Sequence, residues 1–481
     1  MKSSQPNFLI LLADQMQGHV LDPTHCCQTP NLDRLRQRGL QFTRAYAPSA
    51  TCSPSRASLM TGLLPHNHGV QWVTHSVQED QGLLRTDCRH WAQSLQEAGY
   101  DTAYFGKWHV ERTERPEDFG WNSVHRGPGM KGRAKSAGTA PKGPDLSLFE
   151  KYGRLDKPNG YAERILYAVS EEPLENRPMT QTVEAARQYL ENRSQTDVPW
   201  CCCVSLKEPH DPFICSAETY ACYDPETTPL PANGKDPLTD KPGLYRRSAD
   251  IFSGLDAQDV REARTCYFAS ITEIDTLWGR LLALLESQGM ARDTIIIVTS
   301  DHGELLGAHG LFCKNISAFE EIYNIPLLMA GPGIPDGQSS RARVGLHDLH
   351  PTILSLAGIE PSEVELDARS FTDVFQDPQL GEGTFTEGYA EYHGSRFLLS
   401  QRIYWEDNWK LVFNGFDFDE LYNLETDPDE QRNLVGLEEF NDRTSHMMRG
   451  VWRHINSSRD ASLINTSYPP LRLGICGPET E

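Results

Sequence analysis

The sequence has few positive charges and a large excess of negative ones. Its 481 residues include 45 Lys and Arg against 67 Asp and Glu, which gives a net charge of -22. A surface of this sign repels nucleic acid and anionic membranes at long range. We therefore expect no nucleic-acid partner. Any site for an anion should be a local cluster of cationic side chains.

Long apolar runs are also missing. No segment is long and apolar enough to span a membrane, so we expect no membrane partner. The short run Phe8–Leu12 leads into Asp14 without the small-residue cleavage site of a signal peptide. The 12 cysteines contain no Cys-x-x-Cys pair, and several adjoin one another, which makes a poor disulfide framework. These features predict a cytoplasmic protein whose cysteines are mostly small buried apolar side chains.

Strands alternate with helices through most of the chain. The β-branched run Thr294–Thr299 is typical of a buried parallel strand. Such alternation predicts an α/β fold with a large, mostly parallel sheet flanked by helices. The other expected strands are Phe8–Leu12, Leu40–Ala45, Tyr100–Phe105 and Trp200–Leu206, and the expected helices are Thr29–Leu35, Ser55–Gly62, Trp91–Ala98, Thr182–Arg193 and Glu262–Gln288.

The pattern changes after about residue 365. Short strands are expected at Arg396–Gln401, Trp409–Asn414 and Glu420–Asn423, with a helix near Arg443–Ile455. We therefore divide the chain into a larger α/β domain, residues 1–365, and a C-terminal subdomain, residues 366–481, built of a small antiparallel sheet, a helix and a tail. Two segments rich in Gly, Pro and charged residues, 125–160 and 215–255, are expected to be long loops.

Acidic residues stand directly after two of the expected strands. Asp14 follows the first strand, and Asp301-His302-Gly303 follows the β-branched one. In open α/β sheets, ligands bind beyond the carboxyl ends of the strands. Oxygen and nitrogen atoms of Asp and His can hold one cation there, and Gly303 permits a tight turn. Taken alone, each Asp is also compatible with a turn or a helix cap.

The most specific motif is Cys52-Ser53-Pro54-Ser55-Arg56, followed by Ala57–Gly62. It resembles the signature of the formylglycine-dependent sulfatases, in the alkaline phosphatase superfamily. In that family a dedicated enzyme oxidises the Cys to formylglycine. The hydrated aldehyde carries two hydroxyls, of which one attacks sulfur and the other later expels sulfate. The resemblance implies an alkaline-phosphatase-like sandwich, with residues 1–365 as the catalytic sulfatase domain.

Further blocks match the same family in order along the chain. Phe105–His109 resembles its second block, and Leu206–Phe213 resembles the block that supplies a substrate-contacting His. Ser300–Gly303 resembles the metal-binding block, and Asp419–Pro428 the usual C-terminal motif. Any single block could match by accident. The occurrence of all blocks in the expected order is what supports the resemblance.

The resemblance implies roles for individual residues. One divalent cation, most simply Ca²⁺ and alternatively Mn²⁺ or Mg²⁺, would be held by Asp14, Gln15, Asp301, His302 and the formylglycine at Cys52. The implied catalytic residues are Cys52, Arg56, Lys107, His109, His210 and Lys314. In this assignment His109 is the base that expels sulfate and His210 the acid for the leaving alcohol.

Substrate identity is left open by the sequence. Asp14-Gln15 and Asp301-His302 look more like the choline sulfatase and phosphonate monoester hydrolase branch than like sulfatases with paired Asp. Val73, however, falls near the position of the choline sulfatase Asn. We expect a small, carbohydrate-like sulfate ester. Specificity is expected from the loops 64–80, 125–160 and 215–255 and from the C-terminal subdomain. Candidate contacts to the substrate are Lys207, Trp72, His75, Trp121 and Trp405.

Three functional readings stay open at this point. The first is a sulfuric ester hydrolase, the second a phosphonate monoester or phosphodiester hydrolase with the same nucleophile, and the third a non-catalytic binding protein of the same fold. The expected partners are the small-molecule ester and, transiently, the formylglycine-generating enzyme. The sequence does not decide between a monomer and a homo-oligomer.

Overall fold

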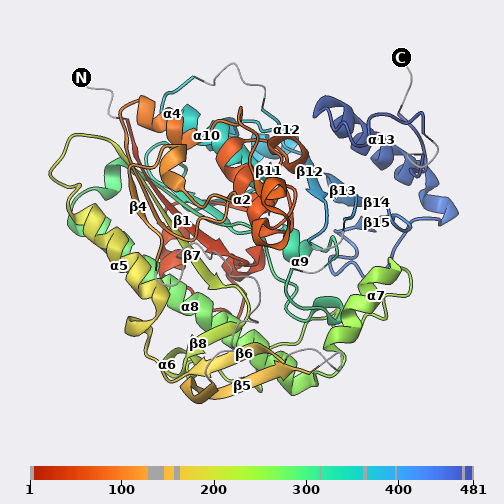
Figure 1. The fold of residues 1–481 in the computed structure, drawn as a ribbon, viewed down its shortest axis with the longest axis horizontal. Coiled ribbons are helices and arrows are strands. Elements are labelled where there is room, and N and C mark those ends of the chain that lie inside the picture. Colours follow the sequence, from red (N-terminus) through yellow and green to blue (C-terminus); the bar gives the residue numbers. More distant parts are fainter. Residues whose placement is uncertain are drawn as a thin grey trace.

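The structure is a computed structural model that describes residues 5–127, 146–156, 163–314, 316–360, 366–395, 398–468 and 472–478. One large sheet lies at its centre, with helices on both faces (Figure 1). A small sheet and a terminal helix stand at the right of the view, and a three-stranded sheet lies at the bottom. This arrangement is the α/β sandwich that the alternating pattern predicts.

The large sheet has eight strands, and β10 runs antiparallel to both of its neighbours. The remaining neighbours pair in parallel. In spatial order the strands are β11 (Gln338–Gly345), β2 (Leu40–Tyr46), β10 (Leu327–Ala330), β9 (Thr294–Ser300), β1 (Asn7–Asp14), β7 (Trp200–Pro209), β3 (Asp101–Gly106) and β4 (Ser123–His125). The central position of β1 explains why it is buried on both faces.

Alternate residues of β1 feed two separate cores. Leu9 and Leu11 pack with one set of helices, while Phe8 and Ile10 pack with the other, as the two-residue period of a strand requires. The first set is α1 (Pro30–Arg36), α5 (Pro178–Glu191) and α8 (Ala257–Ser287). The second set is α2 (Cys52–Thr61), α4 (Trp91–Glu97), α10 (Leu349–Leu356) and α11 (Asp373–Gln376). Figure 1 shows these two sets on opposite sides of the sheet.

The C-terminal sheet is antiparallel, in the order β12 (Glu387–Tyr392), β13 (Gln401–Glu406), β14 (Trp409–Asn414) and β15 (Glu420–Asn423). The helix α13 (Asn441–Ser457) covers one face through Met447, Val451 and Ile455. The expectation of a small antiparallel sheet with one helix is confirmed, although β12 was not expected. The strand expected at Arg396–Gln401 is wrong, because β13 begins only at Gln401; residues 396–397 lie outside the described part.

Both expected long loops contain regular structure. Residues 149–155 form β5 (Phe149–Leu155), which pairs antiparallel with β6 (Arg164–Ser170), and β6 pairs in parallel with β8 (Phe213–Ser216). Residues 215–255 include α6 (Ala217–Tyr220) and α7 (Gly243–Ala249). The loop prediction is therefore wrong for these stretches, since tertiary pairing outweighs their local Gly and Pro content. Residues 128–145 and 157–160 of the first loop lie outside the described part.

The boundary between domains remains a prediction. Residues 371–385, after the proposed boundary at 365, send Phe371, Val374 and Phe375 into the core of the large sheet. The short helix α12 (Pro378–Thr384) follows them. Among the described residues, no helix combines the length and the apolar character that crossing a bilayer requires. All 12 cysteines are free, and seven of them are buried.

Candidate active site

The carboxyl ends of two neighbouring strands bring Asp14 and Asp301 together. Strands β1 and β9 pair in parallel with Ala13 opposite Ser300, so the next residue of each strand lies at the same edge. Both carboxylates are fully buried. Oδ1 of Asp301 accepts the backbone N–H of Gln15 (3.1 Å) and of His302 (3.0 Å), which fixes the carboxylate.

The loop after Asp301 depends on a glycine. A Cβ at Gly303 would lie 2.1 Å from the backbone oxygen of Glu321, so any other residue would displace this loop. His302 is held by the same loop, because its Nδ1 lies 2.8 Å from the carbonyl oxygen of Gly303. A carbonyl only accepts, so Nδ1 carries the proton and Nε2 presents a lone pair to the site.

Cys52 is the first residue of α2. Thr51 before it is extended, and Gly62 ends the helix in the left-handed region at φ 70°. The helix was expected to begin at Ser55, after Pro54. It begins three residues earlier because proline is tolerated in the first turn of a helix. The side chain of residue 52 therefore lies at the positive end of the helix dipole.

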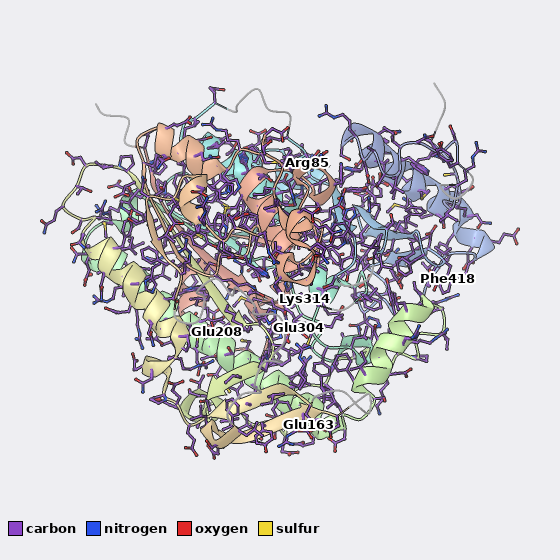
Figure 2. The ribbon with its side chains drawn as sticks, viewed as in Figure 1. Arg85, Glu163, Glu208, Glu304, Lys314 and Phe418 are labelled. Atoms are coloured by element: carbon purple, nitrogen blue, oxygen red, sulfur yellow. The ribbon has the colours of Figure 1, made fainter. Side chains whose placement is uncertain are left out.

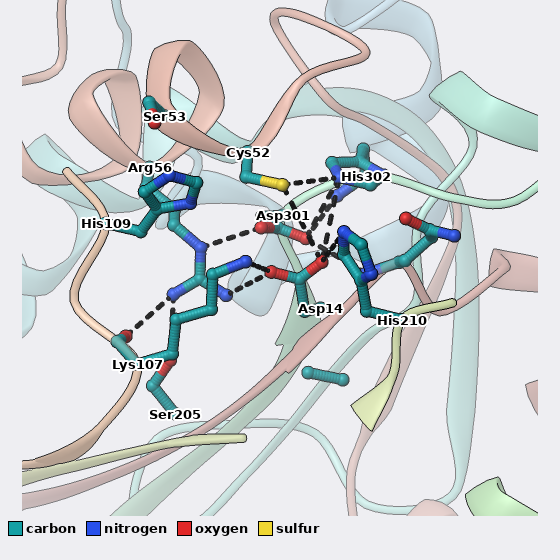
Figure 3. Close-up of polar contacts among 12 residues, drawn as sticks. Asp14, Cys52, Ser53, Arg56, Lys107, His109, Ser205, His210, Asp301 and His302 are labelled. Atoms are coloured by element: carbon teal, nitrogen blue, oxygen red, sulfur yellow. Dashed lines mark hydrogen bonds and ion pairs between the residues drawn. The ribbon is translucent and has the colours of Figure 1, made fainter. Parts of the chain in front are cut away.

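Four ligand atoms meet at this point (Figure 3). Sγ of Cys52 lies 3.3 Å from Nε2 of His302 and 3.7 Å from Oδ1 of Asp14. Nε2 of His302 lies 3.8 Å from Oδ1 of Asp301 and 3.9 Å from Oδ1 of Asp14. Buried carboxylates, an imidazole lone pair and the atom at residue 52 make a donor set that fits one divalent cation.

Arg56 lies behind the ligand cluster and is fully buried. Its Nε donates to Asp301 (2.7 Å), and its Nη2 donates to Asp14 (3.2 Å). Its Nη1 donates to the carbonyl of Lys107 (3.0 Å) and to Oγ of Ser205 (2.8 Å). The guanidinium thus holds the two acids in place, and its hydrogen bonds go to them, to Lys107 and to Ser205.

Two lysines bring further positive charge. Lys107 donates to Oδ2 of Asp14, whereas Lys314 donates to Oε1 of Gln15 (3.0 Å) and to Nε2 of His210 (2.5 Å). Burial alone would raise the pKa of Asp14, but the positive charges of Lys107 and Lys314 hold it well below its usual range. Burial also opposes ionisation of the Cys52 thiol, yet the positive charges of Lys107 and Lys314 lower its pKa. The site therefore stabilises negative charge at residue 52.

Both predicted acid–base histidines are neutral. Burial, with the charge of Lys107, lowers the pKa of His109 to about 4. Burial, with the charge of Lys314, lowers the pKa of His210 to about 3. Nδ1 of His210 lies 2.7 Å from the carbonyl oxygen of Asp211 and therefore carries the proton, which leaves Nε2 to accept from Lys314.

Gln15 borders the ligand cluster, and two acids that the sequence analysis gave no role hold it there. Its Nε2 donates to Glu304 (2.5 Å) and to Asp211 (3.1 Å), while its Oε1 faces Lys314. Gln15 has φ 72°, a conformation unusual for a side chain of this size. Glu304 directly follows Gly303, and Asp211 directly follows His210. This adjacency to motif residues is the signal by which the sequence could have indicated a supporting role for both acids. Glu304 and Lys314 lie together near the middle of Figure 2.

The proposed substrate contacts fall into two groups. Trp72 is half-buried with its Nε1 on the carbonyl of His393 (2.8 Å), His75 stacks on His109, and Lys207 is exposed at the end of β7. Trp121 and Trp405 were wrong as sugar-stacking candidates. Trp121 is packed edge-on against Trp91 and Tyr104, and Trp405 is fully buried with its Nε1 on Glu320 (2.8 Å).

Residues 6–359 match the family model described as Sulfatase. The chain belongs to the sulfatase family. Residues 307–457 also match the model for the C-terminal region of N-sulphoglucosamine sulphohydrolase. This family belongs to the alkaline phosphatase superfamily, whose fold the large sheet and its flanking helices share. The chain is therefore a sulfatase hydrolase.

Individual relatives support the same assignment. A choline-sulfatase of Rhizobium meliloti is 31% identical over 468 residues, 90% of this chain and 83% of the relative. An N-acetylglucosamine-6-O-sulfatase of Bacteroides thetaiotaomicron is 25% identical over 520 residues, 93% of this chain and 86% of the relative. The solved phosphonate monoester hydrolase of Silicibacter pomeroyi superposes with a TM-score of 0.76 at 23% identity, covering 95% of this chain and 97% of that one, and shows the shared fold.

Proposed function

We propose that this sulfatase releases inorganic sulfate from a small organic sulfate ester, through a formylglycine formed from Cys52 and one divalent cation. The observation that carries the proposal is the meeting of Asp14, Asp301 and His302 with residue 52 at the start of α2. In an unconverted chain, Sγ of Cys52 stands where a hydroxyl of the hydrated aldehyde would be. Conversion requires a formylglycine-generating enzyme as a transient partner.

The cation would be held by Asp14, Gln15, Asp301, His302 and residue 52. When bound, it would polarise the ester oxygens and lower the pKa of the attacking hydroxyl. Ca²⁺ is the first choice because most of the donors are oxygen atoms, and the imidazole of His302 also suits Mn²⁺ or Mg²⁺. Gln15 would lie farther from the cation than the other four residues, because its Oε1 already accepts a hydrogen bond from Lys314.

The two lysines have distinct tasks in this proposal. Lys107, paired with Asp14, stabilises the ionised hydroxyl at residue 52. Lys314 neutralises charge on the transferring group. Arg56 acts through the acids that it fixes.

The histidines divide the proton transfers. Neutral His109 can accept the proton of the second hydroxyl when sulfate is expelled. His210 and Lys314 share one hydrogen bond, and together they supply the proton that the leaving alcohol needs. His75, stacked on His109 with its Nδ1 3.1 Å from Nε2, orients that ring.

We propose a carbohydrate sulfate as the substrate class. The match of residues 307–457 to the N-sulphoglucosamine sulphohydrolase model and the N-acetylglucosamine-6-O-sulfatase relative support it. Trp72 and Lys207 are the proposed contacts beyond the ester. A screen of defined sulfated mono- and disaccharides with choline sulfate tests this class. Turnover confined to choline sulfate would refute it.

A phosphonate monoester or phosphodiester is the second candidate substrate. Gln15 and His302, in place of a second Asp and an Asn, favour it because this combination resembles the choline sulfatase and phosphonate monoester hydrolase branch. Steady-state rates on a matched aryl sulfate and aryl phosphonate separate the two. We expect the sulfate to give the larger kcat/KM, and dominant phosphonate turnover would reverse the order of our proposals.

A non-catalytic binding protein is the remaining alternative. Cys52, Arg56, Lys107 and both acids are intact, which argues against it. It would be revived if protein with verified formylglycine hydrolysed no ester in a broad panel of sulfates, phosphonates and phosphodiesters.

A further inference from the structure

Three arginines gather at the β11 edge of the large sheet, apart from the residues of the active site. Arg44 on β2 and Arg343 on β11 are register partners in the parallel pair, and Arg341 precedes Arg343 by two residues. Like charges that face each other across a strand pair are destabilising. In a chain with a net charge of -22, such a cluster needs a physical explanation.

Most partners of these arginines are uncharged oxygens of the turn between β13 and β14, and Nε of Arg343 also donates to the carbonyl of Thr386 (3.3 Å). Nη1 of Arg44 and Nη2 of Arg343 both donate to the carbonyl of Asp407, at 3.1 and 2.6 Å. Arg44 and Arg341 both donate to Oδ1 of Asn408, the latter at 3.4 Å. Shared acceptors bring the three guanidinium groups side by side.

Two carboxylates lie near the cluster: Oε1 of Glu382 accepts the backbone N–H of Arg341 (2.8 Å), and Glu320 lies close enough for its charge to act on Arg44 and Arg343. Among the residues that the structure describes, neither carboxylate nor any other forms a salt bridge with the side chains of these three arginines. Tyr46, next to Arg343, donates to Glu320 (2.7 Å), but that carboxylate is already paired with Lys410 at 3.0 Å. The positive charge of the cluster is therefore open to an external anion.

Arg343 is built into the fold as a fixed charge. It is only 2% exposed, and its guanidinium lies 4.9 Å from the ring centre of Tyr46. A Cβ at Gly388 would lie 2.7 Å from its Cδ, so glycine at that position makes room for the side chain. Its Nη1 has no hydrogen-bond partner among the described residues. A buried guanidinium with an unpaired N–H group costs folding free energy unless an anion lies nearby.

We propose that Arg44, Arg341 and Arg343 form a second oxyanion site, which binds sulfate away from the catalytic centre. Arg44 is half-buried and Arg341 is exposed, so both can reach a ligand from solvent. Guanidinium groups bind tetrahedral oxyanions through paired N–H donors. Arg343 is buried behind them, so solvent screens its positive charge only weakly. The ligand is free sulfate or a sulfate group carried on a sugar.

The test is a titration with sodium sulfate at constant ionic strength, followed by calorimetry and by thermal melting. The wild type should bind sulfate at two sites, one of them catalytic. In the double variant Arg44→Gln/Arg341→Gln, the affinity of the second site for sulfate should fall about tenfold or more. Added sulfate should then raise the melting temperature of this variant less than that of the wild type. Its turnover of a small aryl sulfate at low sulfate concentration should not change.

The matched control is Arg247→Gln/Arg292→Gln, which removes the same charge from two exposed positions elsewhere. It should bind sulfate as the wild type does. Repeating the titration with a sulfated disaccharide on a Cys52→Ala background separates the two sources, since tighter binding of the sugar at this site identifies a carried sulfate group. Identical sulfate stoichiometry in the wild type and the Arg44→Gln/Arg341→Gln variant would overturn the proposal without bearing on catalysis at Cys52.

Discussion

At the scale of single residues, Cys52 is the most exacting position. It is buried at the first position of α2, and its neighbours are the ligand atoms of Asp14 and His302. Cys52→Ala should abolish turnover, by at least about four orders of magnitude, because no hydroxyl remains to attack. Cys52→Ser should be nearly as inactive, since a single hydroxyl cannot expel the bound sulfate. Steady-state rates and circular dichroism melts measure both, and loss of folding in Cys52→Ala would instead make Cys52 a core residue.

Arg56 is the residue that links the two acidic ligands of the proposed cation site. It bridges Asp14 and Asp301 in a fully buried position. Arg56→Met should leave two carboxylates close together and should cost roughly 3–5 kcal/mol of unfolding free energy. Excess divalent cation should recover part of that loss, because it neutralises the same pair.

Denaturant unfolding with and without added cation measures this effect. Lys207→Met is a suitable control, since Lys207 is exposed at the end of β7. If the Arg56 variant were as stable as this control, the assignment of Arg56 as the partner of both acids would fail.

At the scale of elements, a buried ionic cluster joins the helix α3 (Pro65–His68) to the C-terminal part. Nδ1 of His66 lies 2.5 Å from Glu391 on β12, and its Nε2 lies 3.0 Å from the carbonyl of Ser458 after α13. Both partners accept, so both nitrogens carry protons. Burial lowers the pKa of His66, but these partners outweigh burial and raise it to about 9.

This cluster predicts a pH-dependent stability. A histidine whose folded pKa lies above its unfolded value stabilises fully below about pH 6.5 and loses that contribution as the pH rises through about 9. The shift corresponds to roughly 3 kcal/mol. The difference in unfolding free energy between wild type and His66→Gln should therefore shrink over this range. A difference independent of pH would contradict a charged His66. Its charged neighbours besides Glu391 are Arg402 and Asp460, whereas burial lowers the pKa of both His68 and His393.

The sequence predicts elements well where local pattern and burial agree. β14, β15 and the β-branched β9 were found within a residue of their ends, because each has a continuous apolar or alternating pattern. The strands β5, β6 and β12 were missed. Charged residues and a glycine in both β5 and β12 weaken the local strand pattern, and pairing with neighbouring strands decides the structure of all three. Likewise Asp14, Asp301 and Cys52 could be predicted from motifs, whereas the support from Glu304 and Asp211 needed three-dimensional proximity.

At the scale of the whole molecule, the acidic surface and the cationic site are compatible. The net charge of -22 keeps anions away on average, while Arg56, Lys107 and Lys314 lie within one buried cluster with the cation ligands. Removing the cation should then affect the entire protein. It leaves Asp14 and Asp301 to repel each other and residue 52 without its proposed partner.

Chelation should abolish turnover and lower the melting temperature. A cation present at about 100 times its Kd stabilises a protein by about 2.7 kcal/mol, so readdition should restore both properties together. Parallel readdition of Ca²⁺, Mn²⁺ and Mg²⁺ ranks the candidates, and we expect Ca²⁺ to restore the most. Full activity in the presence of chelator, with metal content verified as absent, would contradict a cation site at these residues.

The central claim is that turnover requires formylglycine at position 52. Mass spectrometry of the peptide that contains residue 52, on preparations made with and without a formylglycine-generating enzyme, measures the fraction converted. Sulfate-ester turnover measured on the same preparations should rise in proportion to the aldehyde or its hydrate and extrapolate to zero at zero conversion. Equal turnover in preparations whose residue 52 is entirely cysteine would contradict the account.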